Sequence, residues 1–226
     1  MLNDFLSLFY PEVCAACSNG LLKHEETICT QCYIHLPKTN YHTNPNNPVA
    51  LVLQGRFRFR EATAFYAFHK KSKVQQVLHE LKYKNNPEVG RVTGRWFGET
   101  LAKTSFAQAD YLLPVPLHPK KQKQRGYNQS MQIAIGMSAS LNIPVEEKLL
   151  YRKTETKTQT KKDKGDRWQN VEDIFGLTNP ETFEGKKIIL VDDVITTGAT
   201  IESCANSLLK INNVELFVAA LAFAEQ

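Results

Sequence analysis

From residue 61 onward, the hydrophobic and polar residues alternate between two patterns, one typical of strands and one typical of helices. The expected strands are short apolar runs, whereas the expected helices carry apolar residues at every third or fourth position. This alternation predicts an α/β fold with a mainly parallel sheet flanked by helices. We expect strands at residues 62–68, 111–115, 187–191 and 214–223, and helices at residues 74–81, 90–103, 129–141 and 201–209.

The first 48 residues do not follow this alternation. Leu2, Phe5, Leu6 and Phe9 have the spacing of a short amphipathic helix. Residues 37–48 are polar, rich in Asn and Thr, and without periodicity, so we read them as a linker. We therefore expect a small region at 1–48, with a short helix, a cysteine-rich module and the linker, and a larger domain at 49–226.

Four of the five cysteines form two CxxC pairs separated by eleven residues. Each pair can place two thiolates on one metal ion, and the loop between the pairs can close a tetrahedron. A redox-active CxxC or simply buried cysteines are the alternatives. We predict a structural zinc site, a small zinc ribbon, because four cysteines leave no open coordination position. Its ligands are Cys14, Cys17, Cys29 and Cys32.

The apolar run at 187–191 leads directly into two acidic residues, Asp192 and Asp193. In open α/β folds, ligands bind at the carboxyl edge of the sheet, which is where these carboxylates should lie. A loop of hydroxyl residues around Gly198 follows, and its backbone N–H groups should lie at the start of the next helix. Carboxylates beside a phosphate site would repel the phosphate unless they bind sugar hydroxyls or a divalent cation. A ribose 5-phosphate therefore fits both the acidic pair and the hydroxyl-rich loop.

This segment, IILVDDVITTGAT, resembles the fingerprint of the type I phosphoribosyltransferases. The resemblance implies that Asp192 and Asp193 hold the ribose hydroxyls of phosphoribosyl pyrophosphate (PRPP). It implies that the loop after them binds the 5-phosphate, with Mg²⁺ accompanying PRPP. The implied loop residues are Thr196, Thr197, Gly198, Ala199 and Thr200.

The motifs LPVPL and RGYNQS, followed by Arg152 and Arg167 and preceded by the double CxxC, are similar to those of the ComF family of competence-related proteins. The order of motifs also resembles the transferase half of glutamine-PRPP amidotransferases. That likeness implies that Arg125, Gly126, Tyr127 and Asn128 meet pyrophosphate. Arg125, Arg152 and Arg167 are candidate catalytic residues. An arginine can form bidentate hydrogen bonds to pyrophosphate, and arginines on mobile loops can close over a reacting centre.

One departure separates the chain from those amidotransferases. They carry a cysteine nucleophile after the initiator Met, whereas this chain has Leu2, so we do not expect glutamine-derived ammonia. A receiver domain also has paired aspartates beside a strand, but only 33 residues follow Asp193, too few for the rest of a receiver. Another α/β phosphate-binding protein is the remaining alternative.

Composition narrows the partners further. The 226 residues carry a net charge of +5, with basic residues concentrated at 120–125 and 152–167. Such segments imply an anionic partner or a merely solvated loop. No apolar run approaches the roughly 20 residues of a membrane helix, and the N-terminus does not read as a signal peptide, so we expect a cytoplasmic protein without membrane insertion.

Two functions from different classes follow. One is a phosphoribosyltransferase that transfers ribose 5-phosphate to an acceptor the sequence does not identify. The other is an accessory protein of DNA uptake that keeps the PRPP fold and binds single-stranded DNA or a competence protein through its basic segments. The oligomeric state does not follow from the sequence.

Overall fold

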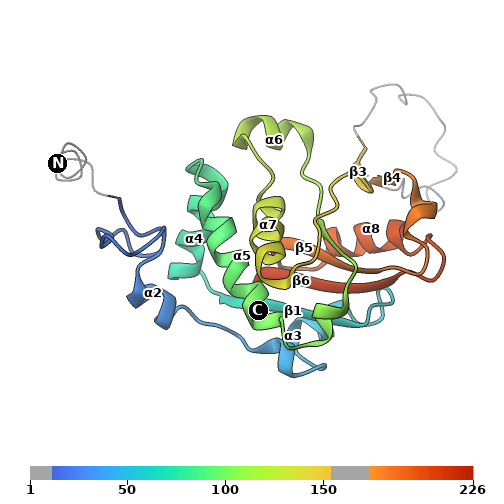
Figure 1. Cartoon of the computed structure of the whole chain (residues 1–226), viewed down its shortest axis with the longest axis horizontal. Helices are drawn as coiled ribbons and strands as arrows, with labels where there is room; N and C mark the ends of the chain where they lie inside the picture. The colour runs from blue at the N-terminus through green and yellow to red at the C-terminus, as the bar shows by residue number, and fades with distance from the viewer. Residues whose placement is uncertain (1–11, 154–173, 226) are drawn as a thin grey trace, which may run out of the picture.

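The computed structural model describes residues 12–153 and 174–225 (Figure 1). Its centre is a four-stranded, entirely parallel sheet with strand order β1-β6-β5-β2. A two-stranded antiparallel sheet, β3-β4, lies beside it. The predicted mainly parallel sheet is therefore confirmed. The strands are β1 (Glu61–Phe68), β2 (Tyr111–Pro114), β3 (Leu150–Arg152), β4 (Phe175–Leu177), β5 (Lys187–Ile195) and β6 (Glu215–Ala224).

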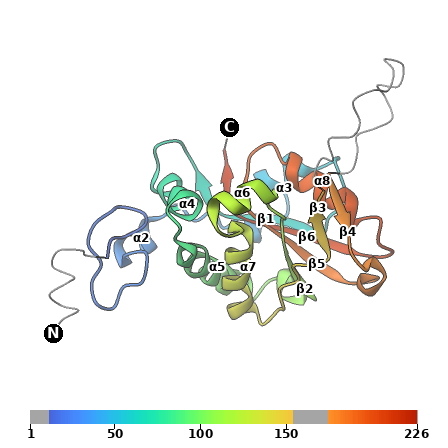
Figure 2. The same ribbon diagram turned by 90° about the horizontal axis from the view of Figure 1, so that it is seen from above.

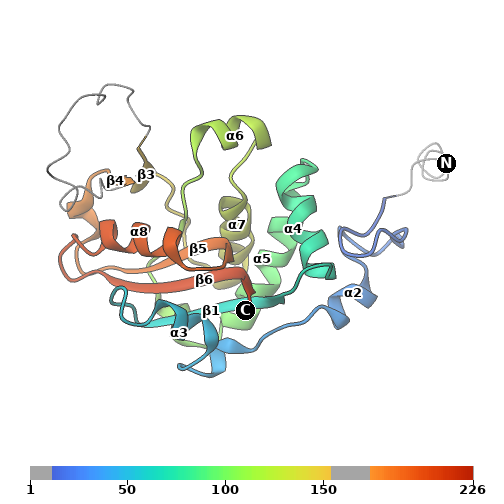
Figure 3. The same ribbon diagram turned by 180° about the vertical axis from the view of Figure 1, so that it is seen from behind.

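Helices cover both faces of the sheet, because the side chains of each buried strand alternate between two cores. Ile189 and Val191 of β5 join the core formed with α4, α5 and α7, whereas Ile188 and Leu190 join the core formed with α3 and α8. Figure 1 shows α5 and α7 on the face of the sheet that is turned toward the viewer. Figure 3, the view from behind, shows α8 on the opposite face. The helices are α2 (Thr30–His35), α3 (Pro48–Leu53), α4 (Lys73–Tyr83), α5 (Pro87–Leu101), α6 (Pro119–Arg125), α7 (Gln129–Leu141) and α8 (Ala199–Leu208).

Strand β5 is longer than the sequence predicts. We expected it to end at residue 191, but it continues to Ile195 because Val194 and Ile195 pair with Ala222 and Phe223 of β6. Asp192 therefore lies within the strand, where polar residues weaken the apolar pattern that marks a strand in the sequence.

Three short helices, α2, α3 and α6, were missed. The polar sequence of α6 has no apolar stripe, and Pro119 at its start and Gly126 at its end hold the chain in a single projecting helix. Helix α3 is apolar almost throughout, and buried Asn47 caps it by accepting from the N–H groups of Val49 and Ala50.

The expected linker packs along the open edge of β1. The N–H of Thr39 donates to the carbonyl of Phe65 at 3.0 Å, and the N–H of Ala67 donates to the carbonyl of Pro37 at 3.0 Å. The middle of this segment forms the short 3₁₀ helix Tyr41–Thr43. The backbone at the start of the segment thus satisfies backbone groups of the edge strand, which requires no periodic pattern of side chains.

The predicted N-terminal amphipathic helix lies outside the described residues, as does most of the basic segment 152–167. Among the described helices, none combines the length and the hydropathy needed to cross a membrane.

Candidate functional site

The two acidic residues lie together on β5 and each is bound by a residue from a different helix. The hydroxyl of Ser130, at the start of α7, donates to Asp192 Oδ1 at 3.0 Å. The ammonium of Lys82, near the end of α4, lies 2.9 Å from Asp193 Oδ1. Both carboxylates are half-buried, so a ligand can reach the pair, but it must compete with Lys82 for Asp193.

The surroundings of Asp192 disfavour its charge. Burial, followed by the neighbouring charge of Asp193, raises the pKa of Asp192 to about 7, although hydrogen bonds from the Asp193 N–H and Ser130 and the charge of Lys82 act in the opposite direction. A carboxyl group whose ionised form is disfavoured by its surroundings, at the edge of a sheet, is more typical of a ligand site than of a structural ion pair.

The threonine loop follows the acidic pair immediately and turns into α8. Gly198 is the N-cap of α8, is buried, and has a φ of +79°. A Cβ at this position would lie 2.7 Å from Leu53 Cδ2, so both the backbone conformation and the close packing require glycine. Thr196, Thr197 and Thr200 are exposed around it, which leaves their hydroxyls and the first N–H groups of α8 facing solvent.

The RGYN segment joins α6 to α7, and each of its residues has a separate structural contact. Arg125 donates to Gln129 Oε1 at 2.8 Å and lies over the ring of Tyr83. Gly126 ends α6 with a φ of +82°. The Tyr127 hydroxyl donates to the carbonyl of Leu81 at 2.6 Å, and Asn128 caps α7 while donating to the carbonyl of Val115 at 3.0 Å.

The structure describes two of the three candidate catalytic arginines, Arg125 and Arg152. Arg125 lies on the same side as Lys82, whereas Arg152 ends β3 and lies over the ring of Phe175, on the side of α8. Arg167 lies outside the described residues. The role of these arginines therefore stays a prediction.

The four cysteines of the CxxC pairs form a compact sulfur cluster. Their Sγ atoms all lie within 4.8 Å of one another, and Cys17 Sγ is 3.8 Å from Cys29 Sγ. A tetrahedral ion with ligands at about 2.3 Å would space its sulfurs by about 3.8 Å, so the donor set fits zinc. Burial acts to raise the pKa of Cys14, but backbone N–H donors, that of Cys29 first, outweigh it and lower this pKa to about 7.

Lys82 and Ser130 are site residues that the sequence did not reveal. Lys82 is the less accessible of the two to sequence reasoning. It lies in a helix whose apolar stripe was recognised, but a lysine between the apolar positions reads as a solvated residue. Its contact with Asp193 spans 111 positions of the chain, and no local pattern encodes such a pairing.

The chain is similar to known proteins along most of its length. Residues 127–225, which include the acidic pair and the threonine loop, match the model of the phosphoribosyl transferase domain. Competence protein F of Haemophilus influenzae is 37% identical over 57% of this chain and 62% of its own length. Competence protein ComFC of Bacillus subtilis is 29% identical over 84% of this chain and 81% of its own.

The chain is a homologue of competence proteins F and ComFC. The DNA utilization protein YhgH of Escherichia coli is a further relative, 28% identical over 91% of this chain and 87% of its own length. Among solved structures, glutamine PRPP amidotransferase from B. subtilis, crystallised with ADP and GMP, has a TM-score of 0.44 and 24% identity over 63% of this chain and 30% of that chain.

Proposed function

We propose that this ComF homologue binds PRPP at the edge of the sheet where β5 leads into α8. Asp192 and Asp193 would accept hydrogen bonds from the ribose hydroxyls, and the N–H and hydroxyl groups of residues 196–200 would bind the 5-phosphate. The observation that carries the proposal is the continuity of these two parts: half-buried carboxylates and an exposed, hydroxyl-rich helix start lie on one short segment.

The reaction that best fits such a site is phosphoribosyl transfer. A nucleophile would attack C1 of the ribose while pyrophosphate leaves, so negative charge develops on the leaving group. Arg125 and the backbone at Gly126 would bind that group, with Arg152 and Arg167 as further candidates. Mg²⁺ would enter with the diphosphate oxygens of PRPP and neutralise part of their charge. The carboxylates of Asp192 and Asp193 would remain with the ribose.

We propose further that zinc occupies the cysteine cluster and has a structural role. The donor set of Cys14, Cys17, Cys29 and Cys32 is closed, and the cluster belongs to the same buried core as α4, α5 and α7. Metal binding would therefore stabilise the region before β1 and its packing on the larger domain.

Calorimetric titration with PRPP in the presence of Mg²⁺ tests the main proposal. We expect saturable binding to the native protein and at least tenfold weaker binding to the double variant Asp192→Asn/Asp193→Asn, because ribose hydroxyls would lose charged acceptors. The matched control is Glu147→Gln/Glu181→Gln, which removes two exposed acids elsewhere. Unchanged binding to the first double variant, or no binding to the native protein, would rule the proposal out.

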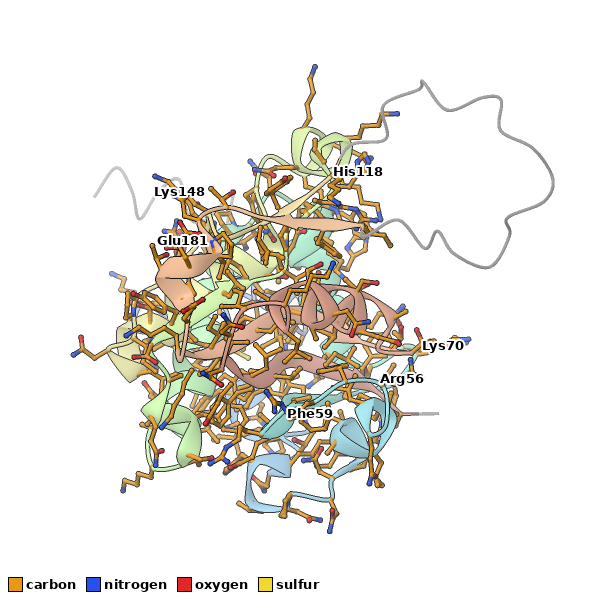
Figure 4. All side chains as sticks on the ribbon, turned by 90° about the vertical axis from the view of Figure 1, so that its right-hand side faces the viewer. Arg56, Phe59, Lys70, His118, Lys148 and Glu181 are labelled. Atoms are coloured by element: carbon orange, nitrogen blue, oxygen red, sulfur yellow. The ribbon has the colours of Figure 1, made fainter. Side chains whose placement is uncertain are left out.

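A second candidate function is the binding of single-stranded DNA. Two observations favour it: the names of the relatives, and the exposed lysines of α6, Lys120, Lys121 and Lys123, on a helix that projects from the rest of the chain (Figure 1). Figure 4 shows His118 at the start of this helix, away from Arg56 and Phe59 at the other end of the molecule. Phosphates could approach Lys120 and Lys121 of α6 without entering the PRPP site, whereas Lys123 also lines a cavity beside Lys82.

Fluorescence anisotropy with a labelled single strand tests this candidate. If α6 binds phosphates, affinity falls steeply between low and physiological salt, and replacing the three lysines by glutamine reduces the slope on a logarithmic plot by about two, since each single-strand contact contributes about 0.7. Affinity that does not change with salt argues against the candidate.

A further inference from the structure

The ion pair between Lys82 and Asp193 lies at the border of two different environments. The side chain of Lys82 is 18% exposed and that of Asp193 is 14% exposed, so the pair is shielded from solvent without being sealed. On one side lies the acidic pair of β5. On the other side lies a cavity of about 360 Å³ between α4 and α6.

This cavity gathers positive charge. Lys82, Lys123 and Arg125 line it, together with Tyr83 and Asn85, and no acidic residue is among its lining residues. Arg125 is oriented by its hydrogen bond to Gln129 and by the ring of Tyr83. Among the described residues, Lys82 therefore is the cation that reaches both the carboxylate of Asp193 and a space suited to an anion.

The ion pair with Lys82 and a hydrogen bond to a bound ribose would compete for the carboxylate of Asp193. For Asp193 to accept hydrogen bonds from a ribose, its oxygens must be released at least in part from Lys82. An ammonium has three donors and no fixed plane, so it can turn from a carboxylate to a nearby phosphate oxygen by rotation of its flexible stem. A diphosphate in the adjacent cavity would replace Asp193 as the negatively charged partner of Lys82.

We propose that Lys82 exchanges partners when ligand binds, leaving Asp193 to the ribose and binding the diphosphate in the cavity between α4 and α6. This inference rests on the proposed PRPP site and adds to it a ligand-binding residue from α4. Before binding, Lys82 compensates the negative charge of the acidic pair on β5. When Lys82 changes partner, binding of a ribose beside Asp193 and binding of a diphosphate in the cavity become coupled.

Two probes separate this role from a structural one. Inorganic pyrophosphate with Mg²⁺ reports the diphosphate subsite, whereas ribose 5-phosphate carries no diphosphate. We expect Lys82→Met to weaken binding of pyrophosphate at least tenfold, the loss of one charged hydrogen bond, and to change binding of ribose 5-phosphate by less than about threefold. Lys84→Met, an exposed lysine two residues away, is the matched control and should bind both probes as the native protein does.

The conservative variant Lys82→Arg guards against misfolding, because it keeps the charge beside Asp193; we expect it to retain most of the pyrophosphate affinity. Pyrophosphate binding by Lys82→Met within twofold of the native protein would overturn the inference while leaving the PRPP site intact. Equal weakening of both probes would also overturn it, since Lys82 would then only position the acidic pair. If the native protein bound neither probe nor PRPP, the proposed function itself would fail.

Discussion

At the scale of single residues, the site contains a group that is costly to the fold. Asp192 is held where its charge is disfavoured. This feature does not help the chain to fold, since a neutral side chain at 192 would be more stable. Such a cost at the carboxyl edge of the sheet is a physical argument for a binding role. Gly198, in the loop that follows, adopts without strain a left-handed conformation that other residues would not.

The raised pKa of Asp192 predicts a specific dependence of stability on pH. Between pH 4 and 7, folded Asp192 retains its proton whereas the unfolded chain loses it, so this residue's contribution to the free energy of unfolding falls as pH rises through that range. Asp192→Asn removes the dependence. We expect its free energy of unfolding, relative to the native protein, to increase by about 4 kcal/mol from pH 4 to pH 8.

Urea denaturation at several pH values measures this difference. Glu181→Gln, a change at an exposed acid, serves as the control and should show a difference near zero throughout. A flat difference for Asp192→Asn as well would contradict the raised pKa.

The packing around Gly198 predicts a second effect at this scale. Gly198→Ala should lower the free energy of unfolding by about 2 to 3 kcal/mol, because the methyl group meets Leu53 in addition to the strain of a positive φ. Gly185→Ala provides a matched control: its φ is +68°, but no atom lies within 4 Å of the added Cβ, so only about 1 kcal/mol is expected. Equal losses in chemical denaturation would show that the contact with Leu53 is unimportant.

At the scale of elements, the close packing of α5 against α7 sets the position of Ser130 beside Asp192. Gly94 of α5 and Gly136 of α7 let the two backbones approach: a Cβ on Gly136 would lie 2.1 Å from the carbonyl oxygen of Arg91. The helices are also joined by a hydrogen bond from Arg91 to Gln132 at 2.9 Å. The start of α7, and with it one partner of the acidic pair, therefore depends on this helix contact.

The contact reverses the usual effect of alanine in a helix. In an exposed helix, replacing glycine by alanine stabilises by about 1 kcal/mol, but Gly136→Ala should destabilise by about 3 kcal/mol because α7 must move away from α5. Ser138→Ala, on the same helix and only half-buried, should stay within about 0.5 kcal/mol. Thermal and urea unfolding of the two variants provide the test, and a stabilised Gly136→Ala would refute it.

Sequence patterns predicted the longer elements that bury a continuous apolar stripe or run, although the short apolar helix α3 was missed. Residues 129–141 were expected to be helical and form α7, and the last strand differs by one residue at each end. Helix α6 could not be predicted, since it contains no apolar residue in PKKQKQR. The acidic pair and threonine loop were recognisable because they are contiguous, whereas Lys82 belongs to the site only through tertiary structure.

At the scale of the whole molecule, the cysteine cluster is separate from the acidic pair but belongs to the same buried core as Ile189 and Val191 of β5. Figure 2 shows α2 at the end of the molecule opposite α8. Tyr33 of α2 packs on Trp96 of α5, with ring centroids 4.5 Å apart, and Glu26 pairs with Arg95 at 3.2 Å. Loss of metal should therefore reach the larger domain through packing and leave the chemistry of the edge of the sheet unchanged.

Metal removal tests this separation. We expect Cys32→Ser to lose the bound zinc, measured by elemental analysis, and to lower the melting temperature by at least about 4 °C, while PRPP affinity at low temperature changes less than about threefold. His24→Ala is the control, because this exposed histidine of the same region is not part of the sulfur cluster and should keep the metal. Retention of zinc by Cys32→Ser would contradict the four-cysteine assignment.

The division of the chain at residue 48 stays a prediction. The strip formed by residues 37–39 has a practical consequence for any protein shortened at that point. This strip occupies the outer hydrogen-bonding groups of β1, the border strand of the sheet. A shortened chain that began at residue 49 would keep the ligand-binding segments but leave those groups unsatisfied, and an unprotected border strand recruits strands from other molecules. Such a chain should precipitate or self-associate during purification, whereas one that retained residues 37–48 should stay monodisperse.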